Sequence, residues 1–457
     1  MTGAATGPAE GSSGAVRRVT PQAPIPYRGG PRVTDDPERT PPRMTPPITA
    51  TTRGPADVRL LRLLGPAMVA GVAYLDPGNV ASNMTAGARF GYLLVWVVVL
   101  GNLMAWLIQY LSAKLGLMTG KSLPELLGER LRGRWGRRAY WLQAETVAIA
   151  TDLAEVIGGA IALNLLFGLP LLAGGLVTGA VSLVLLVIQT RGGAQPFERV
   201  ITALMVVIAV GFTVGVVVDP PDAGAAAAGL LPRFDGSESV LLAASILGAT
   251  VMPHAIYAHS ALARDRFGRV DGVAARRRIL TATRIDVTVA LAIAGTVNLA
   301  ILLLAAHSLA GVSGTDSLEG AHAAIGAALG PVVATLFAVG LLASGLASTS
   351  VGAYAGAEIM HGLLNLRVPL VARRLVTLIP ALIVLGIGFD PTRALVLSQV
   401  VLSFGIPFAL VPLVALTRNR ALMGDQANRW FTTLGAILAA VFLIVLNGLL
   451  LWLTFTG

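Results

Sequence analysis

The sequence predicts an all-α membrane protein with about eleven transmembrane helices, since about 20 apolar residues are needed to cross a hydrocarbon core of about 30 Å. The chain is 55% hydrophobic and 13% charged, whereas about a quarter of the residues of soluble domains are charged. Three long runs contain no Asp, Glu, Lys or Arg: Tyr92 to Leu107, Leu169 to Gln189 and Leu434 to Phe455. A soluble globular fold is therefore excluded, and the lipid bilayer is an expected partner.

Residues 1–58 differ in composition from the rest of the chain. They are rich in Pro, Gly, Thr and Ala, carry scattered Arg, and show no apolar periodicity. Such segments cannot bury enough apolar surface to fold. We expect a disordered cytoplasmic tail over residues 1–58 and a transmembrane domain over residues 59–457. The tail lacks an apolar core with a cleavage site, so the first membrane helix is expected to act as the targeting signal.

Apolar runs separated by polar breaks place the spans and orient them. Arg and Lys cluster in alternate loops while the intervening loops are acidic or neutral, which puts the N-terminus in the cytoplasm and the C-terminus outside. The spans are expected to begin near Leu63, Leu93, Leu142, Leu169, Val200, Val240, Val287, Val332, Leu375, Ala394 and Leu434. The main basic loops hold Arg130, Arg132, Arg134, Arg137 and Arg138, and then Arg264, Arg266, Arg269, Arg276, Arg277 and Arg278.

The charge balance and the missing cysteines narrow the class further. The net charge of +10 fits cytoplasmic loops of a membrane protein better than a nucleic-acid surface. The chain has no Cys, which excludes disulfides and thiolate metal sites. Its Arg, Ala and Gly content is typical of GC-rich bacterial genomes, so we expect the bacterial cytoplasmic membrane. No cofactor motif occurs, so neither an enzyme nor a bound cofactor is expected, and no obligatory protein partner is evident.

The first span contains a carboxylate next to a helix break. Asp76 lies mid-helix, where a charge costs about 2.5–3.5 kcal/mol on insertion scales and marks a functional site by default. Pro77 has no N–H, so the carbonyl of Ala73, four residues earlier, loses its helical partner. Pro77 and Gly78 together favour local unwinding, and the residue before a proline resists the α conformation. Asn79 adds a side-chain oxygen one turn past Asp76.

The sixth span repeats this arrangement. Pro253 frees the carbonyl of Ala249, and Met252, directly before the proline, is the residue pushed out of α geometry. The two breaks together offer one carboxylate, one amide oxygen, two carbonyls and one thioether. Four hard oxygens and one soft sulfur suit a divalent transition metal better than Mg²⁺ or Ca²⁺, which seek oxygen only.

The positions of the two breaks also predict a transport mechanism. Spans 1 and 6 are the first helices of two five-helix halves. Discontinuous helices at corresponding places in two inverted repeats mark the substrate site of secondary transporters near the middle of the membrane. No strong residue-level repeat accompanies this placement.

At these residues the chain resembles the Nramp family of proton-coupled divalent metal transporters. The resemblance covers roughly residues 60 to 455, and its signatures are Asp76-Pro77-Gly78-Asn79 and Met252-Pro253-His254. It implies a leucine-transporter-type fold, with five plus five helices in inverted repeat and one extra. It also implies uptake of Mn²⁺, and of Fe²⁺ or Cd²⁺, coupled to protons. Further similar segments are Glu145 to Gly158, Val297-Asn298, Leu342 to Gly345, Tyr354 to Gly356 and Leu397 to Gln399.

The resemblance also assigns residues. The metal ligands are expected to be Asp76, Asn79, Met252 and the carbonyls of Ala73 and Ala249, in agreement with the reading of the two breaks. Met252 argues against the sister branch of magnesium transporters, which lacks this methionine. The sequence departs from the family pattern at Ala255, at Leu346-Ala347 and at Gly405, none of which is an expected ligand.

Acidic residues in the third span predict a proton route. Several acids in one apolar helix must face the bundle interior, water or counter-charges, and His254 has an unperturbed pKa near 6.5 that suits proton exchange. By resemblance the pathway comprises Glu145, Asp152, Glu155, His254, Arg373 and Arg374. The alternative is a structural salt-bridge network that ties span 3 to span 9. Gln399 and His259 are expected to act in gating, although His259 could simply face the cytoplasmic vestibule, and Glu358 is expected to be a gate or interface residue.

These features predict alternating access, in which the two broken helices rock to expose a metal ion first outside and then inside. Two rival functions stay open. One is a sodium-coupled amino-acid carrier on the same fold, for which the acidic Asp76 would be poorly placed beside a substrate carboxylate. The other is a metal sensor that transports nothing, which would need an output domain.

Overall fold

Helices make up all the regular structure of residues 65–131, 133–192 and 194–456, which are the residues that the structure, a computed structural model, describes. Eight helical segments of this part are long and apolar enough to cross a bilayer. Two of the eight, Pro77–Thr119 and Gly236–Phe267, each combine two of the helices given below. The predicted all-α membrane fold is therefore confirmed. The count of eleven spans stays a prediction, and the predicted tail lies outside the described residues.

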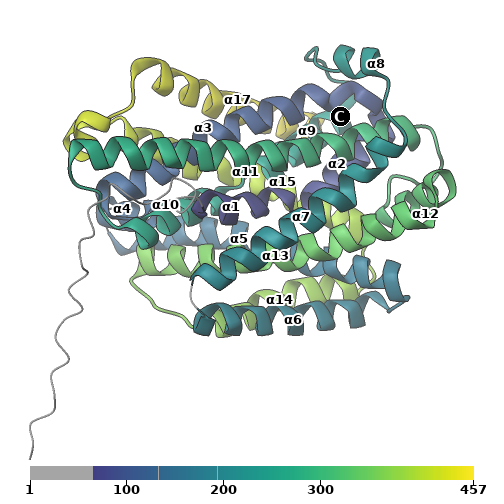
Figure 1. Ribbon diagram of the computed structural model, residues 1–457, viewed down its shortest axis with the longest axis horizontal. Coiled ribbons are helices and arrows are strands. Elements are labelled where there is room, and N and C mark those ends of the chain that lie inside the picture. Colours follow the sequence, from purple (N-terminus) through teal and green to yellow (C-terminus); the bar gives the residue numbers. More distant parts are fainter. Residues whose placement is uncertain (1–64, 132, 193, 457) are drawn as a thin grey trace, which may run out of the picture. The chain divides into compact units, whose positions relative to one another are not determined.

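The first half of the chain alternates long helices with short ones (Figure 1). Helices α3 and α6 begin two residues after their predicted span starts, but α5 and α7 begin eight and six residues before theirs, and in the second half the helix Val273–Ser308 begins fourteen residues early. The short helices α4 and α8 were not predicted. The elements are α1 (Pro66–Val72), η2 (Ala73–Leu75), α2 (Pro77–Phe90), η3 (Gly91–Leu94), α3 (Val95–Thr119), α4 (Leu123–Arg130), α5 (Arg134–Phe167), α6 (Leu171–Gly192), α7 (Ala194–Val218) and α8 (Ala223–Ala228).

The second half repeats this pattern with the second broken helix at its start. The elements are α9 (Gly236–Thr250), α10 (Pro253–Phe267), α11 (Val273–Ser308), α12 (Leu318–Leu329), α13 (Pro331–Leu364), α14 (Leu370–Gly386), α15 (Pro391–Thr417), α16 (Arg420–Met423), η4 (Gly424–Gln426) and α17 (Trp430–Thr456).

Both predicted helix breaks are present. The chain leaves helical geometry at Asp76, with φ −67° and ψ 160°, between η2 and α2. It leaves it again between α9 and α10, where Met252 has φ −45° and ψ 120°. In each case the residue before the proline is the extended one, and the proline opens the next helix, where its missing N–H costs no hydrogen bond.

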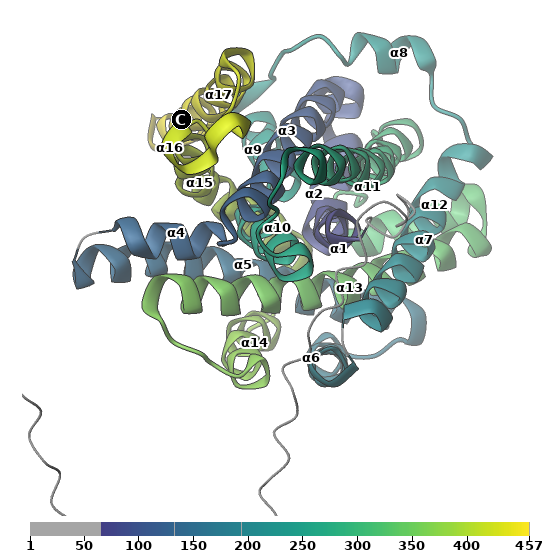
Figure 2. The same cartoon turned by 60° about the vertical axis from the view of Figure 1, so that its left-hand side comes forward.

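The half-helix α1 lies inside the bundle, where it packs against α7, α10, α11 and α13 (Figure 2). Helix α5 packs against α13 and α15, and α6 and α14 lie side by side at the edge of the bundle in both views (Figures 1 and 2). The two broken helices therefore occupy the interior, and α14 reaches it through its contacts with α5.

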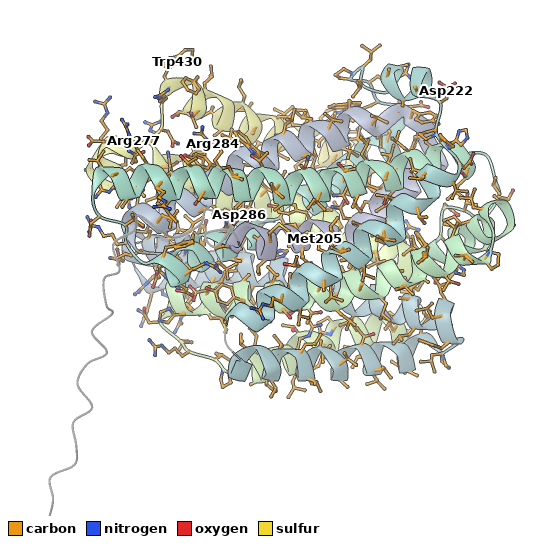
Figure 3. The ribbon with its side chains drawn as sticks, in the orientation of Figure 1. Met205, Asp222, Arg277, Arg284, Asp286 and Trp430 are labelled. Carbon is orange, nitrogen blue, oxygen red and sulfur yellow. The ribbon has the colours of Figure 1, made fainter. Side chains whose placement is uncertain are left out.

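Charged loops gather at opposite ends of the long helix α11 (Figure 3). Arg277 lies in its second turn, next to the basic loop that precedes the helix. Ser308, the last residue of α11, donates a hydrogen bond to Asp219 at 2.9 Å, and Asp222 caps the nearby α8. The separation of basic and acidic loops is the pattern that the orientation prediction relied on.

Candidate metal centre

The Asp76 carboxylate is fixed by two hydrogen bonds. As the N-cap of α2, its Oδ1 accepts from the Asn79 N–H at 2.8 Å, a standard way to satisfy one of the free donors of a helix start. Its Oδ2 accepts from Nε2 of Gln399, on α15, at 3.1 Å. The side chain is fully buried. The break thus presents an oriented carboxylate in the bundle interior, at the positive end of a helix dipole.

The Asn79 side chain already has hydrogen-bond partners in η2 and in its own helix α2. Its Nδ2 donates to the carbonyl of Tyr74 at 2.6 Å, and its Oδ1 accepts from Nδ2 of Asn83 at 2.8 Å. The predicted ligand oxygen of Asn79 therefore has a donor in this structure. Because an amide oxygen has two lone pairs, it can bind a cation only by sharing or releasing the hydrogen bond from Asn83.

The Ala73 carbonyl lacks its helical partner, because the residue four positions on is Pro77, but it accepts a different hydrogen bond. The 3₁₀ turn η2 brings the N–H of Asp76 within 3.3 Å of this carbonyl, which replaces the donor that Pro77 lacks. This hydrogen bond is long, and the second lone pair of the oxygen stays available for coordination. The next two carbonyls are also satisfied, that of Tyr74 by Asn298 of α11 at 3.0 Å and that of Leu75 by the Ser344 hydroxyl of α13.

The second break contributes a buried thioether. Met252 and Ala249 are both fully buried, and Pro253 has no N–H to donate to the Ala249 carbonyl. No group of three or more His, Cys, Asp or Glu side chains able to hold a metal occurs among the described residues. The mixed set that the sequence predicts has Asp76 as its one carboxylate.

Gln399 shows that the two breaks lie together. A Cβ atom on Gly78, in the first break, would come within 1.8 Å of Nε2 of Gln399. A Cβ atom on Gly248, just before Ala249, would come within 1.9 Å of the Gln399 carbonyl oxygen. Helix α15 therefore approaches α2 and α9 as closely as it does only because both positions are glycine, and its glutamine lies between the two breaks.

The acids of α5 form a buried network with two arginines of α14. Arg373 pairs with Glu145 at 2.8 Å and with Asp152 at 3.6 Å, and Arg374 pairs with Asp152 at 2.7 Å and with Glu155 at 3.2 Å. Arg374 has an exposed side-chain fraction of 0%. It also donates to Ser182 of α6 and Thr349 of α13. The predicted pairing is present, and it ties four helices together in the bundle interior.

The two histidines of α10 have different surroundings. Nδ1 of His254 lies 3.1 Å from the Thr151 hydroxyl, one residue before Asp152 on α5. His259 does not face an open vestibule, as one reading of the sequence suggested. It is buried, and its Nδ1 lies 2.7 Å from Oε1 of Gln109, whose amide donates to the Tyr74 hydroxyl. His259 is thereby connected to the unwound segment of the first broken helix.

Comparison with known proteins decides the family. Residues 67–453 match the family described as natural resistance-associated macrophage protein-like. The chain belongs to the Nramp family. A relative named divalent metal cation transporter MntH, from Mycobacterium tuberculosis, is 62% identical over 395 residues, which are 86% of this chain and 92% of that protein. The resemblance seen in the sequence is thus confirmed, and the relatives named here are transporters, not enzymes.

Solved structures confirm the Nramp fold. The crystal structure of a mutant of the Eremococcus coleocola manganese transporter is 32% identical, covers 85% of each chain and has a TM-score of 0.76. MhsT in complex with L-phenylalanine covers 87% of this chain and 98% of that one, with a TM-score of 0.56. At 14% identity it shows the fold alone. The prediction of a leucine-transporter-type fold is therefore confirmed.

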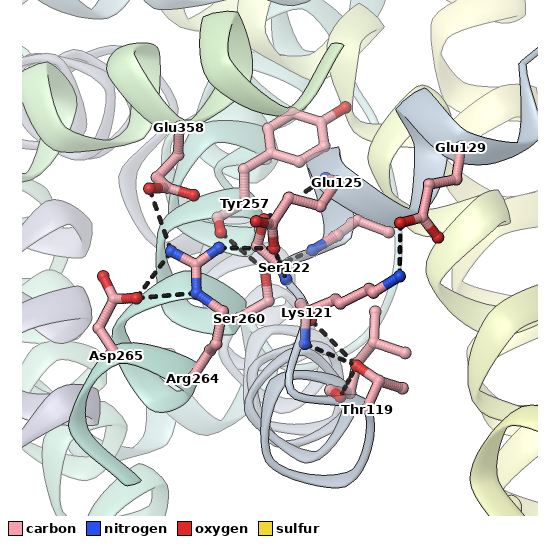
Figure 4. Close-up of polar contacts among 12 residues, drawn as sticks. Thr119, Lys121, Ser122, Glu125, Glu129, Tyr257, Ser260, Arg264, Asp265 and Glu358 are labelled. Atoms are coloured by element: carbon pink, nitrogen blue, oxygen red, sulfur yellow. Dashed lines mark hydrogen bonds and ion pairs between the residues drawn. The ribbon is translucent and has the colours of Figure 1, made fainter. Parts of the chain in front are cut away.

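In this Nramp protein, Arg264 joins three helices at the basic end of the bundle (Figure 4). It lies near the end of α10 and pairs with Glu125 of α4 at 2.6 Å and with Glu358 of α13 at 3.1 Å. Glu358 is thus an interface residue, one of the two roles that the sequence left open. The short helix α4 forms because Ser122 and Glu125 make a capping box, which also points the Glu125 carboxylate toward Arg264.

We expect the Glu125→Gln variant to lower the melting temperature in a pH-dependent way. Burial by itself raises the pKa of Glu125, but hydrogen bonds from the Ser122 N–H and from Arg264 outweigh burial and hold the pKa below its usual value. A lowered folded-state pKa means that the carboxylate stabilises the fold above its ordinary pKa of about 4.3 and loses that contribution as the pH falls through the folded value.

Thermal unfolding in detergent between neutral and acidic pH would measure this effect. The gap between wild type and Glu125→Gln should be largest near neutral pH and should close on acidification. Glu129→Gln is the matched control, because Glu129 pairs with Lys121 on the surface with 53% of its side chain exposed, and such pairs contribute little. A gap of the same size at every pH would contradict the expectation.

Several polar residues around the centre were not singled out from the sequence. Asn83, Gln109 and Thr151 each contact an expected site residue, yet none interrupts its helix. Asn83 could have been found from the sequence, because it is a polar residue one helical turn after Asn79. Gln109 and Thr151 are each one of several polar residues in their helices, a pattern that by itself does not show what they contact.

Proposed function

We propose that this Nramp protein takes up Mn²⁺, and also Fe²⁺ and Cd²⁺, across the bacterial cytoplasmic membrane in symport with protons, by alternating access. The observation that carries the proposal is the pair of helix breaks held together by Gln399, which offer one carboxylate and one thioether from two helices. The names of the relatives, a divalent metal cation transporter and a manganese transporter, agree with it.

The ligand chemistry supports a transition metal as the substrate. The proposed ligands are Asp76, Asn79, Met252 and the carbonyls of Ala73 and Ala249. A thioether is a poor ligand for Mg²⁺ and Ca²⁺, which are bound by oxygen, and a better one for softer divalent ions. A single carboxylate leaves a divalent ion with excess positive charge at the site. That residual charge is attracted inward by a negative-inside potential, at about 2.3 kcal/mol per charge per 100 mV.

The buried network of α5 and α14 supports the proton route. Three carboxylates face two guanidinium groups with almost no access to water, so the ionised acids outnumber their permanent counter-charges by one. A proton on one carboxylate would balance the network. His254 extends the network toward Met252 through Thr151. The structural alternative, a network that only fastens α14 to α5, uses the same contacts, so a functional measurement must separate the two.

The orientation and the gating residues complete the proposal. The N-terminus is proposed to lie in the cytoplasm and the C-terminus outside, with the Arg264 cluster at the cytoplasmic end. Gln399 would release Asp76 when a metal ion enters, because its amide N–H₂ cannot coordinate a cation. His259 would move together with the unwound segment of span 1, because Gln109 connects it to Tyr74 by hydrogen bonds.

The test is Mn²⁺ uptake into proteoliposomes with an acidic exterior, an excess of Mg²⁺ and a pH dye inside. Wild-type protein should take up Mn²⁺ despite the Mg²⁺ and should acidify the lumen as it does so. Asp152→Asn should lose the metal-linked acidification, since the carboxylate shared by both arginines is gone.

The outcomes separate the readings. Metal uptake with unchanged acidification by Asp152→Asn would favour the fastening role of the network over the proton route. No Mn²⁺ uptake by correctly folded wild type would favour a sensor, and uptake of amino acids with Na⁺ would favour the carrier reading.

A further inference from the structure

We propose that Asp286 of α11 is a positioning residue of the metal centre, because it holds the half-helix α1 in register along α11. The inference rests on the proposed function, since the centre it positions is the proposed site of Mn²⁺. Asp286 is neither an expected ligand nor part of the α5–α14 network. It is 3% exposed, in the first half of α11, where burial of a carboxylate is costly unless it is hydrogen-bonded.

The Asp286 carboxylate binds the start of α1, which is far from it in sequence. Its Oδ2 accepts hydrogen bonds from the backbone N–H groups of Gly65 at 3.1 Å and Ala67 at 2.9 Å, which are 221 and 219 residues away in sequence. Pro66 between them has no N–H. The first amides of a helix have no internal acceptor and prefer a negative charge, so this carboxylate satisfies donors that α1 cannot satisfy itself.

The middle of α1 lies directly on α11. A Cβ atom on Gly71 would come within 3.1 Å of Cβ of Ala290, one turn after Asp286, and within 3.4 Å of Cε of Met205 on α7. Figure 3 labels Asp286 and Met205, which lie on the two helices that flank α1. Small residues on both sides bring the backbones of α1 and α11 close together, as is usual for tightly packed membrane helices.

The 3₁₀ turn η2, which continues α1, is also attached to α11. Nδ2 of Asn298 donates to the Tyr74 carbonyl at 3.0 Å. Asp286 and Asn298 are twelve residues apart, a rise of about 18 Å along an α-helix at 1.5 Å per residue. The segment from Gly65 to Tyr74 advances nine residues, about 14 Å at the same rise, so it lies along most of that stretch of α11. Helix α11 therefore holds this segment at its start, its middle and its end.

This attachment matters because α1 is not continuous with α2. The extended geometry of Asp76 interrupts the helix, so the position of α2 does not by itself fix the position of α1. The lateral contacts must do so, and the Ala73 carbonyl, at the end of α1, follows wherever the half-helix goes. Loss of the hydrogen bonds at Asp286 would free the start of α1, and the position of Ala73 relative to Asp76 would then be less well defined.

The test compares Asp286→Ala and Asp286→Asn with wild type in two measurements. The first is Mn²⁺ affinity of the purified protein by titration calorimetry, where we expect about ten-fold weaker binding for Asp286→Ala, the scale of a lost helix cap of about 1.4 kcal/mol. The second is the rate at which a thiol reagent labels Ala70→Cys. Ala70 is 1% exposed and the chain has no other cysteine, so the signal reports α1 alone.

Asp222→Ala is the matched control. Asp222 also caps a helix, through a hydrogen bond from the Ala225 N–H at 2.7 Å, but that helix is α8 in a loop. We expect faster labelling of Ala70→Cys with Asp286→Ala and unchanged labelling with Asp222→Ala. Asp286→Asn keeps the shape and one acceptor but loses the charge, so it should shift both measurements in the same direction by a smaller factor.

The outcomes are distinct. A lower melting temperature with wild-type affinity and wild-type labelling would reduce Asp286 to a purely structural residue and overturn the inference. If Asp286→Ala does not fold, the same two measurements on Asp286→Asn decide, and wild-type values there overturn it. Failure of wild type to bind Mn²⁺ would count against the proposed function alone, because the labelling measurement needs no metal.

Discussion

Asp76→Ala is expected to abolish Mn²⁺ uptake, with a loss greater than about a hundred-fold, since even partners outside the ligand shell cost ten- to hundred-fold when removed. Asp76 supplies the one carboxylate of the proposed centre and is fully buried. Neither broken segment, residues 73–79 or residues 249–254, contains a second Asp or Glu that could replace it. Initial rates of Mn²⁺ uptake into proteoliposomes, normalised to folded protein, would measure the effect.

The matched control for this variant is Asp390→Ala. Asp390 is also followed by a proline and also caps a helix, because its Oδ1 accepts from the Arg393 N–H at the start of α15. It is exposed, however, and lies outside the proposed centre. Removal of an Asp-Pro helix cap alone should leave uptake close to wild type. Full transport by Asp76→Ala would remove Asp76 from the ligand set and with it the proposed site.

Arg374→Met is expected to have the largest effect on stability, about 3–5 kcal/mol, because it leaves buried carboxylates without their counter-charge. Arg374 is fully buried, pairs with Asp152 and Glu155, and bonds Ser182 and Thr349 on two further helices. Methionine fills similar space without replacing any of these contacts. The fraction of monodisperse protein and its melting temperature in detergent would report the loss.

Two further variants make the Arg374 experiment specific. Arg277→Met removes an exposed arginine at the start of α11. It should leave the free energy of unfolding within about 0.5 kcal/mol of wild type, and the melting temperature nearly unchanged. Asp152→Asn in the Arg374→Met background removes one of the two carboxylates that lost Arg374 and should recover part of the lost stability. An Arg374→Met protein as stable as wild type would show that the carboxylates find compensation elsewhere.

The helix breaks could be predicted because proline acts locally. Pro77 and Pro253 each remove one N–H and restrict the residue before them, so the extended geometry of Asp76 and Met252 follows from three consecutive residues. The partner of the Ala73 carbonyl could not be predicted in the same way. Whether the turn before a break tightens to 3₁₀ geometry depends on how the neighbouring helices hold it, here through Asn298 and Ser344.

Some contacts between distant segments could be predicted from the sequence, and others could not. The pairing of α5 with α14 was predictable because buried acids need counter-charges and Arg373 and Arg374 lie at the start of the ninth span. The role of Asp286 was not, because its partners are backbone amides, which every residue except proline carries. The same holds for His259, whose partner Gln109 is one of several polar residues in α3.

The position of Gln399 has a consequence for how this chain tolerates mutation. Gly78 and Gly248 belong to different halves of the protein, yet the same side chain and its carbonyl fill the space beside both. In a scan of all substitutions, both positions should reject even alanine, whatever its effect on metal binding. A smaller residue at position 399 would open space beside Gly78 but not beside Gly248, where the obstacle is backbone. A strict requirement for glycine at position 248 therefore follows from the position of the α15 backbone. At position 78, the substitutions that are tolerated should depend on which residue occupies position 399.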